Sequence, residues 1–346
     1  MHNANVHDVP RPQWLAQVQE PVLDPDQVII DPHHHLWDRE GNRYLLDEFL
    51  HDLRDGHRVV ATVYSQCRSM YRSDGNPAFA PVGETEFANR LAERCADGGH
   101  GGIRVCAGIV GHADLCLGSA VQDVLQAHVE AAGLRFKGIR HIATWDADDS
   151  VMNPALRPPP GLLLDARFRQ GFEALGRMGL SFDAWVFHPQ LQDVAALAAA
   201  FQDTRIVLNH LGGVLNIGAY ADRREEVRQA WLKSMRALAS HPNVYVKLGG
   251  LGMRIAGFDY KRRPLPPTSE TLASDFAPYV LPVVELFGPE RCMFESNFPV
   301  DKGSFSYRVL WNAFKRLAQQ YSQQERDRLF HGTAAQCYRL EERSVP

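Results

Sequence analysis

Residues 28–38 read Val-Ile-Ile-Asp-Pro-His-His-His-Leu-Trp-Asp, a β-branched run that leads directly into three consecutive histidines. Alternate side chains of a strand share a face, so we expect His33 and His35 to point the same way and His34 to be structural. Two imidazoles held together are half of a metal site or the start of an acid–base cluster. A tag remnant would be longer and terminal. The stretch therefore predicts a functional site at the end of the first strand.

The composition is that of an ordinary globular protein. The chain has 346 residues, of which 45% are hydrophobic and 23% charged, which fits one large α/β barrel or two smaller domains. The net charge of −4 gives no attraction for nucleic acid or anionic membranes, and we expect neither as a partner. No apolar run approaches about 18 residues, the length of a membrane span. Six cysteines without Cys-x-x-Cys spacing are typical of reduced thiols, and we expect a cytoplasmic protein.

Strand-like apolar runs alternate with helical stretches along almost the whole chain. The expected strands are residues 27–30, 58–64, 103–110, 136–142, 181–187, 205–208, 243–248 and 291–296. The expected helices are residues 166–178, 191–201, 225–240, 269–287 and 306–319. Eight strands alternating with helices predict an α/β fold, a closed (β/α)₈ TIM barrel. The alternative, an open doubly wound sheet, usually has a glycine-rich first turn, whereas this chain has histidines there. We expect one barrel domain over residues 27–341, preceded by an N-terminal extension over residues 1–26.

Other histidines stand at the ends of expected strands. His188 closes the run Trp-Val-Phe, and His210 closes the run Ile-Val-Leu-Asn. The carboxyl ends of barrel strands meet at one rim, where the sites of this fold lie. A single histidine at such a position is more often structural. Four of them, counting His33 and His35, favour a functional cluster at the rim.

The last expected strand carries polar groups on one face. Glu295 and Asn297 alternate with Phe294 and Ser296, so both can point into the same space. Charges are rarely buried without a partner. Glu295 therefore either pairs with an arginine or histidine inside the barrel or serves the site, and both interpretations stay open.

Arginines are the candidates for substrate binding. Arg68 and Arg72 flank Tyr71 in the loop after the second strand, and Arg140 interrupts the fourth strand. Arginine binds carboxylates with two parallel hydrogen bonds. We expect all four residues, Tyr71 included, to contact a small-molecule substrate, with Arg140 the strongest candidate.

An ordered set of motifs carries a family resemblance. They are residues 33–38 (HHHLWD), 137–140 (KGIR), 188–190 (HPQ), 209–213 (NHLGG), 243–249 (NVYVKLG), 293–299 (MFESNFP) and 331–335 (HGTAA). On these motifs the chain resembles the amidohydrolase superfamily over residues 31–338. It is most similar to the amidohydrolase-related (amidohydrolase 2) group of TIM-barrel lactone hydrolases and metal-dependent hydrolases.

The resemblance implies roles for individual residues. His33 and His35 match the paired ligands of the first strand, and His188 and His210 match the histidines of the fifth and sixth. The catalytic aspartate that the family carries on its eighth strand falls on Asn297. A neutral amide cannot act as a base near neutral pH, and it attracts a divalent cation less than a carboxylate does.

These observations lead to the hypothesis of a hydrolase that opens a lactone or related cyclic ester of a small carboxylated or aromatic compound. In a metal version, His33, His35 and His188 hold Zn²⁺ or Mn²⁺, and His210 or Glu295 transfers the proton. In a metal-free version, the histidines and Arg140 polarise the carbonyl. Asn297 favours the metal-free version. The alternatives are a metal-dependent decarboxylase of an aromatic acid and an inactive binding barrel. A homodimer is compatible with a barrel of this size.

Overall fold

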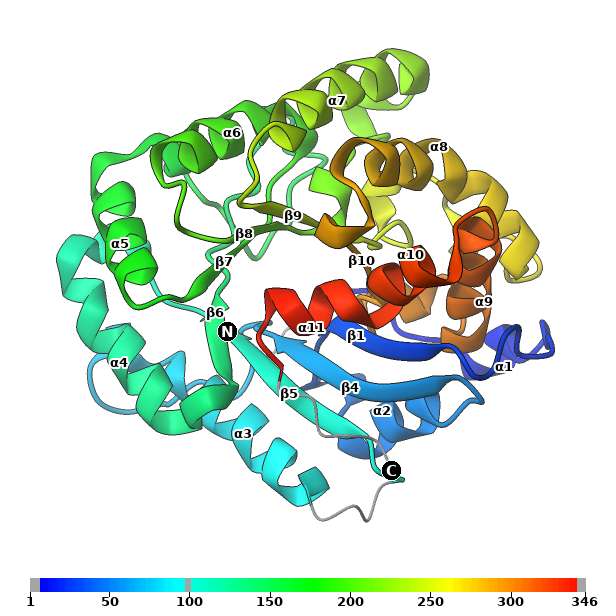
Figure 1. Ribbon diagram of the computed structural model, residues 1–346, viewed down its shortest axis with the longest axis horizontal. Coiled ribbons are helices and arrows are strands. Elements are labelled where there is room, and N and C mark those ends of the chain that lie inside the picture. Colours follow the sequence, from blue (N-terminus) through cyan, green and yellow to red (C-terminus); the bar gives the residue numbers. More distant parts are fainter. Residues whose placement is uncertain (1–6, 97–100, 341–346) are drawn as a thin grey trace.

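The computed structural model describes residues 7–96 and 101–340, and eight parallel strands form its centre (Figure 1). Each barrel strand pairs with the next barrel strand, in the order β1-β4-β5-β6-β7-β8-β9-β10. The strands are β1 Val28–His34, β4 Arg58–Ser65, β5 Arg104–Gly111, β6 Phe136–Ile139, β7 Ser181–Ala184, β8 Ile206–Leu208, β9 Val244–Leu248 and β10 Cys292–Phe294. The predicted (β/α)₈ barrel is confirmed.

The barrel closes at its rim, where the segment after β10 meets β1. His34 and Phe298 form a parallel bridge, and the amide of His35 donates to the carbonyl of Phe298 at 2.8 Å. The amide of Asn297 donates to the carbonyl of His33 at 3.0 Å. Backbone hydrogen bonds therefore join the two stretches from which the sequence predicts a site, although they lie more than 250 residues apart.

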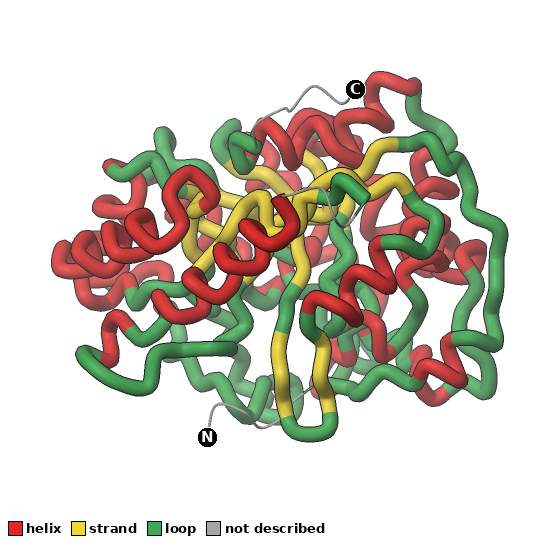
Figure 2. Tube along the Cα trace, turned by 90° about the horizontal axis from the view of Figure 1, so that it is seen from below, coloured by secondary structure: helices red, strands yellow, loops and turns green. Residues whose placement is uncertain are grey.

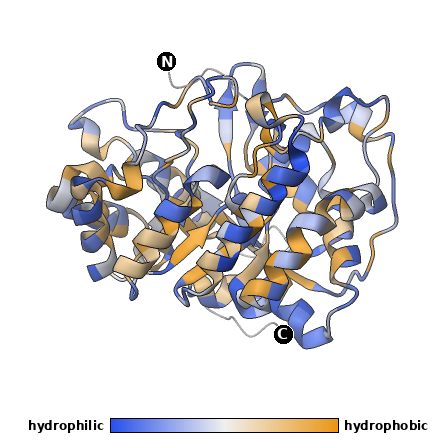
Figure 3. Ribbon diagram, turned by 90° about the horizontal axis from the view of Figure 1, so that it is seen from above, coloured by the Kyte–Doolittle hydropathy of each residue, from blue (hydrophilic) through white to orange (hydrophobic). Residues whose placement is uncertain are grey.

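Helices surround the barrel and turn their apolar sides inward (Figure 3). They are α2 Leu46–Leu53, α3 Val82–Ala96, α4 Val121–Ala132, α5 Ala166–Arg177, α6 Leu191–Ala200, α7 Arg224–Ala239, α8 Ser269–Phe287 and α9 Tyr307–Ala318. Trp231 of α7 and Trp311 of α9 are fully buried. The five expected helices correspond to α5 to α9, whereas α2, α3 and α4 are additions. The described residues also form the short α-helices α1 Pro12–Leu15, α10 Gln323–Asp327 and α11 Thr333–Cys337.

The strand ends differ from the predicted ones. β1 extends to His34, and β6 and β7 end earlier than expected, at Ile139 and Ala184. Arg140 therefore follows β6 and does not interrupt it, and His188 lies four residues beyond β7. Pro189 has no N–H for a sheet ladder, and it lies in the short turn His188–Gln190 that leads into α6.

A hairpin separates β1 from α2 and stands out from one end of the barrel (Figure 2). It consists of β2 Trp37–Arg39 and β3 Asn42–Tyr44, joined by a turn in which Gly41 has a φ of 67°. Side chains alternate along it, so that Trp37 and Arg39 are buried whereas Asp38 is exposed. The hairpin thus presents one face to the barrel.

The described part of the N-terminal extension packs against the barrel. The indole N–H of Trp14 donates to the carbonyls of Arg263 and Pro264, and Glu20 accepts from the amide of Ser269 at 2.7 Å. His7 stacks on Trp37 of the hairpin. In the described part of the chain, no helix combines the length and the apolar character that crossing a membrane requires.

Candidate active site

His33 is the centre of a buried polar cluster inside the barrel. Its side chain is fully buried, and its Nε2 lies 3.2 Å from Nε2 of His35 and 3.1 Å from a terminal nitrogen of Arg140. On the other side of the ring, Nδ1 lies 3.0 Å from Glu295 Oε2 and 3.2 Å from Lys247 Nζ. One imidazole therefore touches two cations, one carboxylate and a second imidazole.

Glu295 bridges two histidines. Its Oε1 accepts from Nδ1 of His210 at 2.7 Å and from the amide of His210 at 3.3 Å, while its Oε2 lies beside His33. Gly249 makes room for it, because a Cβ at that position would lie 2.5 Å from Glu295 Cγ. A carboxylate that accepts from Nδ1 fixes the tautomer in which Nε2 carries the lone pair. Glu295 therefore orients His210 as a proton acceptor.

Burial keeps these histidines neutral. It lowers the pKa of His33, His35 and His210, and for His210 it outweighs the opposing effect of Glu295. Nδ1 of His35 donates to the carbonyl of Ser65 at 2.7 Å, so its Nε2 also carries a lone pair. Neutral rings with free lone pairs can accept a proton or bind a metal ion.

A buried ion pair lies against the side chain of His33. Lys247 of β9 donates to Asp183 of β7 at 2.7 Å, and both side chains are fully buried. Asp183 also accepts from the amide of Asn209 at 3.1 Å and from the hydroxyl of Tyr338 at 2.9 Å. The sequence interpretation missed this network, although Asp183 and Lys247 are charges within apolar runs and give the same signal as Glu295.

Asn297 faces a buried carboxyl group. Its side-chain amide donates to Asp301 at 2.9 Å, and the other oxygen of Asp301 accepts from the amide of Gly252 at 2.9 Å. Burial raises the pKa of Asp301 to about 8. Asn297 and His210 both have a φ of 54°, a conformation uncommon outside glycine and frequent at functional sites.

This contact predicts the effect of restoring an aspartate on the eighth strand. Asn297→Asp places a second buried carboxyl beside Asp301, and two such groups share a proton, so the pKa for loss of that shared proton lies above the unfolded value of about 3.9. Their contribution to stability is present below that value and is lost as the pH rises through the folded pKa. We expect Asn297→Asp to be near the parent at pH 5 and about 3 to 5 kcal/mol less stable at pH 9.

Urea unfolding at the two pH values measures this difference. The exchange variant Asn297→Asp/Asp301→Asn is the control, because it keeps one carboxyl and one amide, and we expect most of the stability at pH 9 to return. A stability loss of equal size at pH 5 and pH 9 would contradict the shared proton.

A cavity of about 120 Å³ opens over the cluster. Its walls are formed by His7, His35, Trp37, Arg39, Cys67, Arg68, Arg140, Ile142, Asn153, Ala155, Leu156, Trp185, His210, Met253, Asn297 and Val300. The walls contain three arginines and no aspartate or glutamate. The cavity therefore favours a small ligand that is polar or negatively charged.

The structure does not bring every predicted residue to this cavity. Arg68 lines it and donates to the carbonyl of Ala155 at 2.7 Å, but Tyr71 does not line it and Arg72 pairs with Glu86 at the surface. His188 stands apart from the cluster. Its Nδ1 accepts from the amide of Leu215 at 3.3 Å, and its ring packs against Tyr220.

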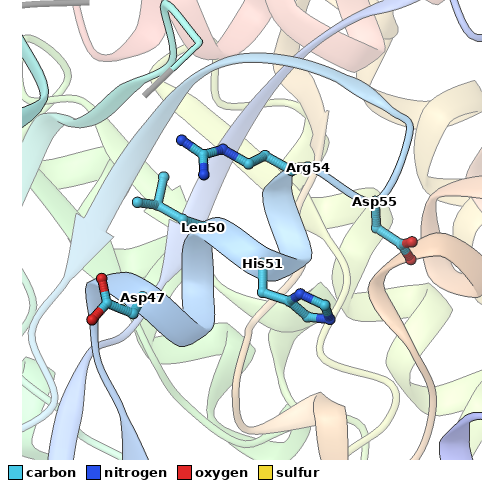
Figure 4. Close-up of a pocket in the computed structure, with 5 residues that line it drawn as sticks. All are labelled: Asp47, Leu50, His51, Arg54 and Asp55. Carbon is cyan, nitrogen blue, oxygen red and sulfur yellow. The ribbon is translucent and has the colours of Figure 1, made fainter. Parts of the chain in front are cut away.

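A larger hollow of about 420 Å³ lies on the outer side of α2 (Figure 4). It is lined by Asp47, Leu50, His51, Arg54 and Asp55, all from α2 and the turn after it. A site for chemistry needs groups that converge from several elements. The cavity over His210 meets this condition, and the hollow on α2 does not.

Three residues of the cluster fit a divalent metal ion. Among the described residues, ligand atoms of His33, His210 and Glu295 lie within 4.8 Å of one another. Two imidazoles and a carboxylate form a donor set found in catalytic zinc sites. Glu295 Oε2 is buried without a well-aligned hydrogen-bond donor, and a cation would satisfy it. Arg140 and Lys247 repel a further positive charge, which weakens the affinity without removing the donors.

Comparisons with known proteins show which family the chain is similar to. The family model described as amidohydrolase matches residues 30–340. The uncharacterized protein y4mH of Sinorhizobium fredii is 33% identical over 340 residues, which cover 91% of this chain and 99% of that protein. A protein of Burkholderia multivorans named L-fucono-1,5-lactonase is 29% identical over 90% of this chain and 96% of its own length.

Solved structures extend the similarity to the fold. An amidohydrolase from Burkholderia multivorans, crystallised with HEPES, aligns with a TM-score of 0.69 at 27% identity. A second crystal form, with bound zinc, aligns with a TM-score of 0.68 at 26% identity. Both alignments cover 91% of this chain and all of the solved one. With a family model matching nearly the whole barrel, the chain belongs to the amidohydrolase family.

Proposed function

We propose that the protein is a hydrolase that opens a lactone or related cyclic ester of a small molecule. The observation that carries the proposal is the Glu295–His210 pair at the cavity, with Arg140 beside it. The relative named L-fucono-1,5-lactonase, similar over 90% of this chain, supports the substrate class. Lactone opening adds one water across the ring C–O bond and yields a hydroxy acid.

His210 acts as the general base in this proposal. Its Nδ1 proton is held by Glu295, so its Nε2 can take a proton from a water that attacks the carbonyl carbon. The imidazolium that results is stabilised by the negative charge of Glu295. It then returns the proton to the ring oxygen as the C–O bond breaks, which leaves His210 neutral for the next turnover.

Arg140 stabilises the negative charge that develops on the carbonyl oxygen. Its guanidinium lines the cavity and is fixed by hydrogen bonds to the carbonyl of Gln66 and to His33. A fixed cation in a buried site is worth more than one in water, because no solvent must reorganise around it. His35, whose Nε2 faces His33, completes the polar floor.

A metal ion is compatible with the same residues. Zn²⁺ or Mn²⁺ held by His33, His210 and Glu295 would supply Lewis-acid polarisation of the carbonyl and a more acidic water. His210 would then serve as a ligand and not as the base. His188, which the resemblance places among the ligands, stands apart from these donors, and Asn297 offers an amide where the family has a carboxylate.

A lactone panel assayed with and without chelator tests the proposal. We expect the purified protein to hydrolyse at least one six-membered lactone, with L-fucono-1,5-lactone in the panel, as measured by acid release in a pH-stat. Loss of activity with chelator and recovery with Zn²⁺ would assign the metal role, and unchanged activity would assign the base role to His210. Carbon dioxide release from hydroxybenzoates without lactone hydrolysis would contradict the proposal.

The remaining parts of the hypothesis stay predictions. They are the contact of Arg68 with the substrate, the carboxylate or aromatic substituent, the cytoplasmic location and the homodimer. The division into an extension over residues 1–26 and one domain over residues 27–341 is also a proposal. The contacts of Trp14 and Glu20 with residues 263–269 support an extension that is packed onto the barrel.

A further inference from the structure

Arg39, at the end of β2, is a buried cation without a counter-ion. Its side chain is only 9% exposed, and one terminal nitrogen is buried with no hydrogen-bond partner. The other terminal nitrogen donates to the carbonyl of Cys67 at 2.7 Å. Across residues 7–96 and 101–340, no carboxylate forms an ion pair with it. The guanidinium is always charged, and charges are rarely buried unpaired. An anion from outside the chain would satisfy it.

The neighbours of Arg39 hold it in one position. Its guanidinium lies over the ring of Trp37 at 4.2 Å, a cation–π contact. Trp37 is fully buried and stacks on His7 at 5.3 Å between ring centroids. Asp8, which follows His7 in the sequence, pairs with Lys261 at 2.8 Å. The cation is therefore fixed before any ligand arrives, and Asp8 already has a partner of its own.

The cavity wall around Arg39 is electropositive. Arg39, Arg68 and Arg140 all line it, and the lining contains no carboxylate. Arg140 contacts His33 and the carbonyl of Gln66, which are uncharged partners. The reacting carbonyl would lie at His210 and Arg140, so Arg39 is available for another part of the same ligand.

We propose that Arg39 is a specificity-determining residue that binds a carboxylate on the ring of the lactone. The proposal rests on the proposed function and names its substrate class, a lactone that carries a carboxylate as well as the ester. Paired N–H donors match the two oxygens of a carboxylate, which a hydroxyl or methyl substituent cannot reproduce. His210 then acts on the ester while Arg39 sets the orientation of the ring.

Binding of two inert probes tests Arg39 without turnover. Benzoate and benzamide have the same shape, differ in charge and contain no ester. By isothermal titration, we expect the parent to prefer benzoate and Arg39→Gln to weaken benzoate binding by about 10- to 100-fold with benzamide unchanged. Arg43→Gln is the matched control, because Arg43 lies on the same hairpin but is 54% exposed and faces Glu48. We expect Arg43→Gln to change neither the affinity for benzoate nor the affinity for benzamide.

Turnover provides the second readout. 2-Pyrone-5-carboxylate and its methyl ester differ in charge, and we expect Arg39→Gln to raise KM for the acid alone, with kcat within a few-fold of the parent. Arg39→Lys keeps the positive charge but lacks the paired N–H donors, and we expect it to recover only part of the affinity for the acid. If Arg39→Gln affects benzoate and benzamide equally, or neither, the inference is overturned even when lactones are hydrolysed. If no lactone is hydrolysed but the selective loss of benzoate binding occurs, the anion site stands and the proposed function fails.

Discussion

His210→Asn is expected to lower kcat for lactone hydrolysis by about 10²- to 10⁴-fold, the usual contribution of a positioned general base. The ring of His210 is fixed by Glu295 at 2.7 Å and packs edge-on against Trp185. Asparagine keeps a polar side chain of similar reach but cannot accept a proton near neutral pH. Steady-state kinetics gives the change, and thermal unfolding shows whether the variant is folded.

His188→Gln is the matched control for this prediction. His188 is also buried and also follows a barrel strand, but it contacts Leu215 and Tyr220 and does not line the cavity. We expect its kcat to stay within a few-fold of the parent. A loss at His188 as large as the loss at His210 would contradict the site described here and would favour His188 as a metal ligand.

Glu295→Gln is expected to reduce kcat by a factor similar to that for His210→Asn, because it affects two imidazole rings at once. The carboxylate faces Nδ1 of both His210 and His33. The amide of glutamine offers one oxygen and one NH₂, so at least one ring must shift its proton to Nε2 and lose the lone pair that faces the cluster. Removal of the negative charge also weakens the binding of any divalent metal ion. Kinetics, together with ¹⁵N NMR of the histidine tautomers, measures both effects.

Glu84→Gln provides the comparison for Glu295. Glu84 of α3 is another fully buried carboxylate, and it accepts from the hydroxyl of Tyr64 at 2.8 Å and the amide of Cys67 at 2.7 Å. We expect Glu84→Gln to destabilise the fold without changing the histidine tautomers. If Glu295→Gln keeps kcat within tenfold of the parent, Glu295 does not orient the base.

The sequence alone determined the class of fold and one corner of the site. Alternation of apolar strands with helices predicts the barrel, because each strand must be covered by a helix before the next parallel strand can pair. The period of a strand places His33 and His35 on one face, and their Nε2 atoms lie 3.2 Å apart. These features depend on residues that are close to one another in the chain, so local sequence patterns are enough to predict them.

Only the tertiary structure decided which distant groups meet. Glu295, which directly follows β10, reaches His33 and, over 85 residues of sequence, His210. Lys247 of β9 reaches His33 over 214 residues. His188 falls outside the cluster because the chain turns at Pro189, and side-chain direction after a strand end follows no fixed period. Arg39 becomes a cavity residue because the hairpin that carries it presents its buried face to the barrel. Closure of the barrel sets these contacts, since it fixes which strand ends face one another across the interior.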